Sequence, residues 1–166
     1  MKRSSGTICR MAAGKITSRS LSAGDYAFFQ YLADHSGEWL VHEAQGRGIE
    51  EYIGAYTELD GEWRVWEKDG ERAGVTFHVR RAPSNQKPWL GTILVDPDRR
   101  GTGLGRGILL ALGEELAAEN KAVFAAVPAS ESGWLEFFSK SGFEQYKSEK
   151  DDGGKEHLLL LKPIQP

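Results

Sequence analysis

The sequence predicts a mixed α/β fold in which a central sheet of about six or seven strands is flanked by about four helices. Short apolar or alternating runs bounded by Gly, Pro or Asp are typical of strands. Leucine and isoleucine residues repeat every four positions between 104 and 116, which indicates an amphipathic helix. Because hairpins alternate with helical crossovers along the chain, the sheet cannot be wholly parallel.

The first half of the chain is expected to hold three strands and two helices. Asp69-Gly70 lies between two strand-like runs, and this dipeptide is a strong signal for a tight hairpin. Ser22 and Asp25 supply a turn and a helix cap before aromatic residues at helical spacing. In chain order, the expected elements are a strand at 16–21, helices at 26–32 and 50–58, and strands at 62–68 and 73–80.

The second half is expected to hold four strands and two helices. Residues 89–95 are almost wholly apolar, as in a strand that is buried on both faces. Pro128 ends a second apolar strand, and Gly142 can close the last helix in the left-handed conformation. The expected elements are strands at 89–95 and 122–127, helices at 104–116 and 134–141, and a closing hairpin of 143–150 and 157–162.

Composition places these elements in one domain, which we expect over residues 15–166. Residues 1–14 are basic, and we expect them to form a flexible leader, since Arg10 interrupts the apolar core that a signal peptide needs. One cysteine excludes an internal disulfide and favours a cytoplasmic location. The net charge of −3 argues against nucleic-acid binding, and no apolar run reaches the roughly 20 residues of a membrane helix.

The strongest functional signal is a run of alternating glycines at 101, 103, 105 and 107, between an apolar strand and a helix. Glycine allows positive φ and the close approach of another atom, at an entropic cost of roughly 0.5–1 kcal/mol each. Unpaired N–H groups and the helix dipole make the start of a helix a site for anions. The segment therefore predicts a phosphate-bearing ligand.

The spacing of this loop differs from that of two common nucleotide-binding loops. No Gly-Lys-Ser/Thr follows the glycines, as a Walker loop requires, and no Gly-x-Gly-x-x-Gly occurs. The pattern that remains is Arg-x-x-Gly-x-Gly at 100–105, introduced by Val-Asp-Pro at 95–97. It resembles the pyrophosphate loop of the GNAT superfamily of acyl-CoA-dependent N-acyltransferases. Lys-Ser-Gly-Phe at 140–143 resembles a second motif of that family, so the resemblance covers most of the chain from about residue 15.

The resemblance implies a GNAT-like fold with a twisted, mostly antiparallel sheet. It also implies an enzyme that moves an acetyl or other short acyl group from acyl-CoA directly to a primary amine, on a small molecule or a protein. Acetyl-CoA is the implied donor, and the histidines show no metal-ligand spacing. The implied CoA-binding residues are Ile93, Leu94, Val95, Arg100, Gly101, Thr102, Gly103, Leu104, Gly105, Arg106, Glu131 and Phe138.

The resemblance stops at the catalytic residues. Many family members carry a tyrosine acid four residues before the glycine of Gly-Phe, and Phe138 stands there in this chain. Tyr146 is the candidate to replace it. The family's carboxylate base corresponds to Thr92, which cannot accept a proton, so His78 is the candidate base, with Glu67 as a weaker one. A strand histidine is more often structural, and water-mediated proton removal fits these gaps best.

Two other hypotheses stay open. The departures at Phe138 and Thr92 favour a non-catalytic GNAT-fold module that binds acyl-CoA as a sensor or interaction domain. A nucleotide-binding protein with the same loop is the third hypothesis.

The resemblance implies that the amine acceptor is recognised by residues of about 25–60 and by the last hairpin, and a homodimer is one candidate assembly. Aromatic and acidic side chains there are either acceptor ligands or core and surface residues: Tyr26, Trp39, Tyr52, Tyr56, Glu43, Glu50 and Glu51.

Overall fold

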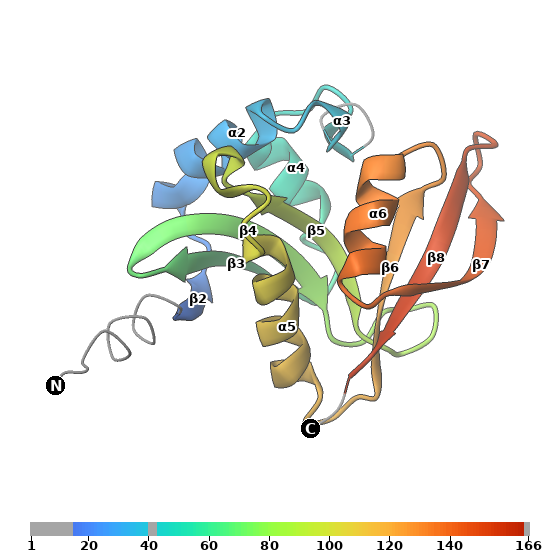
Figure 1. Cartoon of the computed structure of the whole chain (residues 1–166). Coiled ribbons are helices and arrows are strands. Elements are labelled where there is room, and N and C mark those ends of the chain that lie inside the picture. Colours follow the sequence, from blue (N-terminus) through green and yellow to red (C-terminus); the bar gives the residue numbers. More distant parts are fainter. Residues whose placement is uncertain (1–14, 40–42, 165–166) are drawn as a thin grey trace, which may run out of the picture.

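The computed structural model describes residues 15–39 and 43–164 (Figure 1). In these residues seven strands form one sheet. Their order across the sheet is β2 (Ile16–Ser20), β3 (Gly61–Lys68), β4 (Glu71–Val79), β5 (Trp89–Val95), β6 (Ala122–Pro128), β8 (Glu156–Pro163) and β7 (Glu144–Lys150). The expected mixed α/β class is therefore confirmed. The expected leader at 1–14 lies outside the described residues. None of the helices in the described ranges is long and apolar enough to cross a membrane.

The first half of the chain forms the strands and helices that its patterns predict. The turn between β3 and β4 has φ of 55° at Asp69 and 82° at Gly70, as the favoured two-residue hairpin turn requires. A three-residue helix, α3, is an addition, since so short a segment has no periodicity to read. The elements are β2 (Ile16–Ser20), α2 (Tyr26–Asp34), α3 (Gly37–Trp39), α4 (Ile49–Ala55), β3 (Gly61–Lys68) and β4 (Glu71–Val79).

The second half is also formed as expected, with one difference in burial. β6 is buried on one face only, where Val123, Ala125 and Val127 pack in the core, while Ala126 on the other face is exposed. The elements are β5 (Trp89–Val95), a short 3-10 turn (Pro97–Arg99), α5 (Leu104–Leu116), β6 (Ala122–Pro128), α6 (Ser132–Lys140), β7 (Glu144–Lys150) and β8 (Glu156–Pro163).

The helices cover the sheet from both sides, with α5 and α6 in front of it and α4 behind it in Figure 1. Leu104, Ile108 and Leu112 of α5 pack in one core cluster with α6 and β6. Phe29 of α2 and Tyr52 of α4 pack in a second cluster on the opposite face. The four-residue spacing of the α5 side chains is what allows one stripe of the helix to face the sheet.

The sheet opens between β5 and β6, its parallel pair. These strands are in register at Trp89–Phe124 and Leu90–Ala125, and no further pair continues the ladder in the described strands. β5 stays paired with β4 as far as Val95. The carboxyl-terminal halves of β5 and β6 therefore diverge, and the two cavities described next lie at this opening.

Candidate active site

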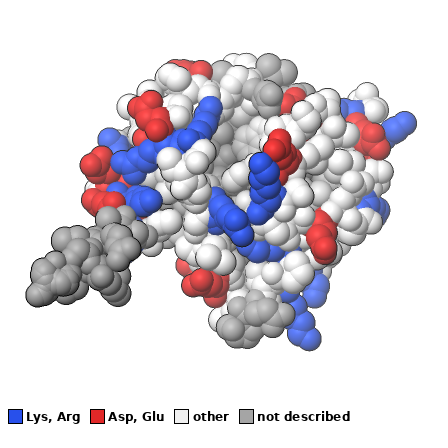
Figure 2. Space-filling model, in the orientation of Figure 1, with Lys and Arg blue, Asp and Glu red and all other residues white. Residues whose placement is uncertain are grey.

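A large cleft of about 860 Å³ lies above the opening in the sheet. The ends of α2 and α3 line one side, residues 93–95 of β5 the floor, and one face of α6 the other side. The loop before α5 closes it. In Figure 2 Lys and Arg side chains gather around a hollow on the face that carries α5 and α6. The cleft is concave and open enough for an elongated ligand with negative charge.

Two structural constraints explain the four alternating glycines of the loop. Gly101 and Gly103 have φ of 80° and 85°, in the left-handed region, and Gly103 is the N-cap of α5. A Cβ on Gly105 would lie 2.9 Å from the Phe137 ring, and one on Gly107 would lie 2.8 Å from a β2 side chain. The first pair thus shapes the loop, and the second pair lets α6 and β2 pack closely against α5.

The first turn of α5 presents its backbone amides to the cleft. The N–H of Gly107 donates to the carbonyl of Gly103 at 2.9 Å, which is the first intrahelical bond. The N–H groups of residues 104–106 precede it and have no acceptor within the helix. These residues line the cleft. The helix dipole adds partial positive charge at the same place, so this end of the cleft suits a phosphate group.

Among the residues that the structure describes, four with basic side chains line the same cleft: Arg99, Arg100, Arg106 and Lys140. Arg100 reaches from the loop to the end of α2, where its guanidinium donates to the His35 carbonyl and the Ser36 hydroxyl, both at 2.9 Å. Arg99 is paired with Glu71 at 3.2 Å. The cleft therefore carries positive side-chain charge, and part of that charge fixes the shape of the cleft.

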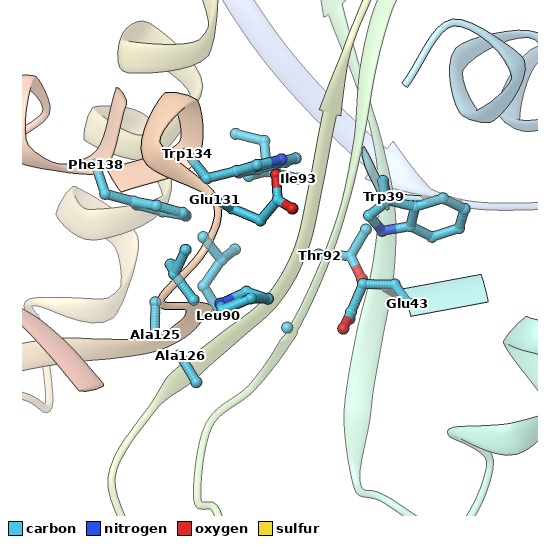
Figure 3. Close-up of a pocket in the computed structure, with 13 residues that line it drawn as sticks. Trp39, Glu43, Leu90, Thr92, Ile93, Ala125, Ala126, Glu131, Trp134 and Phe138 are labelled. Atoms are coloured by element: carbon cyan, nitrogen blue, oxygen red, sulfur yellow. The ribbon is translucent and has the colours of Figure 1, made fainter. Parts of the chain in front are cut away.

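A narrow pocket of about 60 Å³ lies between the diverging strands (Figure 3). Figure 3 shows Thr92, Trp39 and Glu43 on one side and Glu131, Trp134 and Phe138 on the other. Trp39, Ile93 and Trp134 line both the narrow pocket and the large cleft. These three shared residues mark the junction at which molecules in the two cavities would meet.

Glu43 is a carboxylate of the narrow pocket, and burial raises its pKa above the ordinary value. The Tyr52 hydroxyl lies 3.4 Å from its Oε1, 2.9 Å from the Thr92 Oγ1 and 3.3 Å from the Tyr56 hydroxyl. Burial also raises the pKa of Tyr52, so that phenol stays neutral and can donate. The pocket thus holds a carboxylate backed by hydroxyl groups.

The residues predicted to bind CoA divide between the two cavities. Glu131 and Phe138 line the narrow pocket instead of the cleft. Thr102 lines neither, and its hydroxyl donates to the Arg99 carbonyl. The others line the large cleft: Ile93, Leu94, Val95, Arg100, Gly101, Gly103, Leu104, Gly105 and Arg106.

The structure does not bring the two catalytic candidates to these cavities. His78 is fully buried on β4, 3.6 Å from Glu62, and its ring nitrogens have no hydrogen-bond partner among the described residues. Burial lowers the pKa of His78 to about 4. Tyr146 is an exposed residue of β7. Its ring packs edge-to-face with that of Phe124, with the ring centroids 5.7 Å apart. Neither residue lines the cleft or the pocket.

The expected acceptor residues are also divided. Trp39 and Glu43 line the narrow pocket, and Tyr52 and Tyr56 stand behind Glu43. Tyr26, Glu50 and Glu51 line neither cavity. The sequence placed Trp134 only in the expected helix at 134–141. Its position at the junction of the two cavities depends on how α6 packs over the opening in the sheet. Among the described residues, no three His, Cys, Asp or Glu side chains gather as a metal site would need.

Comparisons with known proteins found chains that are similar to this one in sequence or in fold. Residues 81–150 match the family model described as FR47-like protein, a range that runs through the glycine loop, α5, β6 and α6. The uncharacterized protein YkzC of Bacillus subtilis (strain 168) is 42% identical over 133 residues, which is 80% of this chain and 94% of that protein. A GNAT-family protein from Desulfovibrio desulfuricans superposes with a TM-score of 0.72 at 17% identity, over 90% of this chain and 99% of its own.

The chain has the fold of the GNAT acetyltransferases. Two other solved N-acetyltransferases are similar to it. Spermidine N-acetyltransferase from Vibrio cholerae, in complex with CoA and spermine, has a TM-score of 0.70 at 13% identity, covering 90% of this chain and 95% of that one. The ribosomal-protein-S18-alanine N-acetyltransferase of Escherichia coli has a TM-score of 0.59 at 20% identity, covering 92% and 96%. At such identities the likeness is one of fold.

Proposed function

We propose that this protein is an N-acyltransferase that moves an acetyl or other short acyl group from acyl-CoA directly to a primary amine. One observation carries the proposal. The large cleft, with its amides and basic side chains, and the narrow pocket, with its buried carboxylate, share the wall formed by Trp39, Ile93 and Trp134. A donor in the first cavity and an amine in the second would meet at that wall.

The donor is held by groups that match its parts. The pyrophosphate accepts hydrogen bonds from the first turn of α5 and is balanced by Arg100 and Arg106. The pantetheine arm lies along the free edge of β5. Asp96 N–H donates to Ala73 on β4 at 2.8 Å, so by alternation the N–H groups of Val95 and Ile93 point to the opposite edge. These two amides are available to the amide groups of the arm.

The acceptor amine enters the narrow pocket and gives up a proton to Glu43. An alkyl ammonium with a pKa of about 10.4 costs roughly 4.6 kcal/mol to deprotonate at pH 7. The raised pKa of Glu43 makes its carboxylate a better proton acceptor than an exposed one. Its negative charge also attracts the ammonium. Thr92 occupies the position of the usual base but serves here to hold Tyr52.

Under this proposal CoA leaves without receiving a proton from a tyrosine. Phe138 packs against Trp134 with ring centroids 6.0 Å apart and has no proton to give. A thiol with a pKa of about 8.5 is a fair leaving group as the thiolate. The cytoplasm, which the single cysteine favours, is the proposed location. The Vibrio cholerae protein solved with CoA and spermine supports both a CoA donor and an amine acceptor.

Calorimetry with acetyl-CoA, ATP and NADPH tests the donor. We expect acetyl-CoA to bind and the two nucleotides to bind far more weakly. Binding of ATP or NADPH without binding of acetyl-CoA would remove the proposal.

Release of free CoA across a panel of amines then tests the transfer. Phe138, in place of the tyrosine acid, favours one rival, a GNAT-fold module that binds acyl-CoA without reacting. An enzyme releases CoA only when a suitable amine is added. A sensor binds acetyl-CoA and releases no CoA with any amine of the panel, including diamines, lysine derivatives and peptide N-termini.

A further inference from the structure

The indole nitrogen of Trp39 is a buried hydrogen-bond donor without a partner in the described part of the chain. The residue is 3% exposed. Its ring packs edge-to-face with the Tyr52 ring, at a centroid distance of 4.8 Å, and against the Phe29 ring, at a centroid distance of 5.9 Å. Buried indole N–H groups normally have an acceptor. An orphan donor in so well packed a side chain indicates that its acceptor belongs to a ligand.

Trp39 stands where the two cavities meet. It lines both the large cleft and the narrow pocket. In Figure 3 Trp39 lies on the other side of the gap from Trp134, and its nitrogen is on the side of Thr92 and Glu43. Under the proposed function, on which this inference rests, the reacting acyl carbon lies at this junction. The orphan N–H is therefore next to the reacting atoms.

The chemistry of the indole selects its partner. An indole N–H only donates. The ammonium form of an acceptor amine also only donates, and a thioether-like sulfur is a weak acceptor. The carbonyl oxygen of the thioester is a good acceptor, and it gains negative charge during acyl transfer.

We propose that the Trp39 Nε1–H donates a hydrogen bond to the acyl carbonyl oxygen of bound acyl-CoA. The amine nitrogen uses its lone pair to form the C–N bond, and the carbonyl π electrons move to the oxygen that Trp39 holds. The electrons then return to re-form the carbonyl, the C–S bond breaks, and its electron pair leaves on the CoA sulfur. Glu43 passes the first proton, taken from the ammonium before attack, to water, and it then accepts the second proton, which the nitrogen loses after the C–N bond has formed. Trp39 thus stabilises the oxyanion.

The first test is Trp39→Phe, which keeps an aromatic ring and removes the N–H. We expect kcat to fall roughly 100-fold, as on loss of one oxyanion donor elsewhere, while the dissociation constant of CoA changes little. Trp89→Phe is the matched control, because the Trp89 indole already donates to Asn85 at 3.0 Å and lines neither cavity. The control should retain wild-type kcat. An unchanged kcat in Trp39→Phe would overturn the inference.

A second test uses the wild-type protein with 15N-labelled tryptophan, so it does not depend on the variant folding. CoA and acetyl-CoA differ in the acyl carbonyl. We expect the assigned Trp39 indole N–H resonance to move downfield with acetyl-CoA and not with CoA. Equal shifts with both ligands would overturn the inference. If the protein nevertheless releases CoA when an amine is added, the proposed function is unaffected. If neither ligand binds by calorimetry, the proposed function itself fails.

Discussion

The Tyr52 hydroxyl lies 2.9 Å from the Thr92 Oγ1, which joins α4 to β5 behind the narrow pocket. The same hydroxyl is 3.4 Å from Glu43. A threonine that cannot act as a base therefore positions the tyrosine that backs a carboxylate. In this protein the proposed base comes from the segment between α3 and α4 instead of from the strand.

The first prediction concerns Glu43→Gln. The amide is nearly isosteric but cannot accept the proton of the ammonium, so we expect kcat/KM for the amine to fall by roughly 10²–10⁴-fold. Acetyl-CoA affinity should stay close to that of the wild type. Glu51→Gln is the control, because Glu51 is exposed and lines neither cavity. Equal activity of the two variants would remove Glu43 as the base.

The second prediction concerns pH. A base acts in its deprotonated form, so activity rises as pH rises through the pKa of Glu43, which burial raises above the ordinary value. The Tyr52 hydrogen bond lowers that pKa. Tyr52→Phe should therefore move the acid limb of kcat/KM against pH to higher pH. A limb that stays in place or moves to lower pH would contradict the proposed contact.

The third prediction concerns the loop before α5. Gly103→Asp should abolish CoA binding in calorimetry, because it adds negative charge and a side chain at the phosphate site. Gly70→Asp is a matched control, since Gly70 has a similar φ of 82° and open space around it, in the β3–β4 turn. A folded Gly103→Asp protein with unchanged CoA affinity would place the donor elsewhere.

The fourth prediction concerns protonation of the leaving group. If the thiolate leaves unaided, Phe138→Tyr should raise kcat less than about tenfold, although it restores the tyrosine common in the family. Tyr146→Phe should leave kcat unchanged, because Tyr146 is exposed and packs on Phe124. A large loss of kcat in Tyr146→Phe would return the acid role to that residue.

The fifth prediction concerns stability and His78. Its folded pKa of about 4 is below the ordinary value of 6.5, because burial disfavours the charged ring. The unfolded chain therefore binds more protons between these values, and stability falls as pH falls through that window. His78→Leu should lose less unfolding free energy between pH 7 and 5 than wild type in urea titrations. His35→Gln, which removes an exposed imidazole, should keep the wild-type loss.

Local patterns predicted most of the fold. The hairpin at Asp69-Gly70 and the glycine loop depend on backbone conformations that few residues adopt, so their sequence signals are specific. The start of α5 follows from the same loop. Order within the sheet, where β8 lies between β6 and β7, depends on pairing over long distances and has no such local signal.

The candidate site was less accessible to sequence reasoning. Trp39, Thr92 and Trp134 are far apart in the chain and meet only because β5 and β6 diverge. His78 could not be placed on a face from its neighbours, because β4 is buried on both sides and a bulge shifts its register with β5 at Phe77–His78. Periodicity identifies a face only where one side of a strand is exposed.

The fate of a labelled acetyl group distinguishes acyl transfer to an amine from binding of acyl-CoA alone. Protein is mixed with acetyl-CoA carrying a radiolabelled acetyl group and with each amine of the panel in turn, and the products are separated at successive times. We predict that label appears in the amide product in step with free CoA, that none is retained on the protein, and that Glu43→Gln slows both together. Label that remains in acetyl-CoA with every amine, while acetyl-CoA stays bound, would contradict acyl transfer by this site.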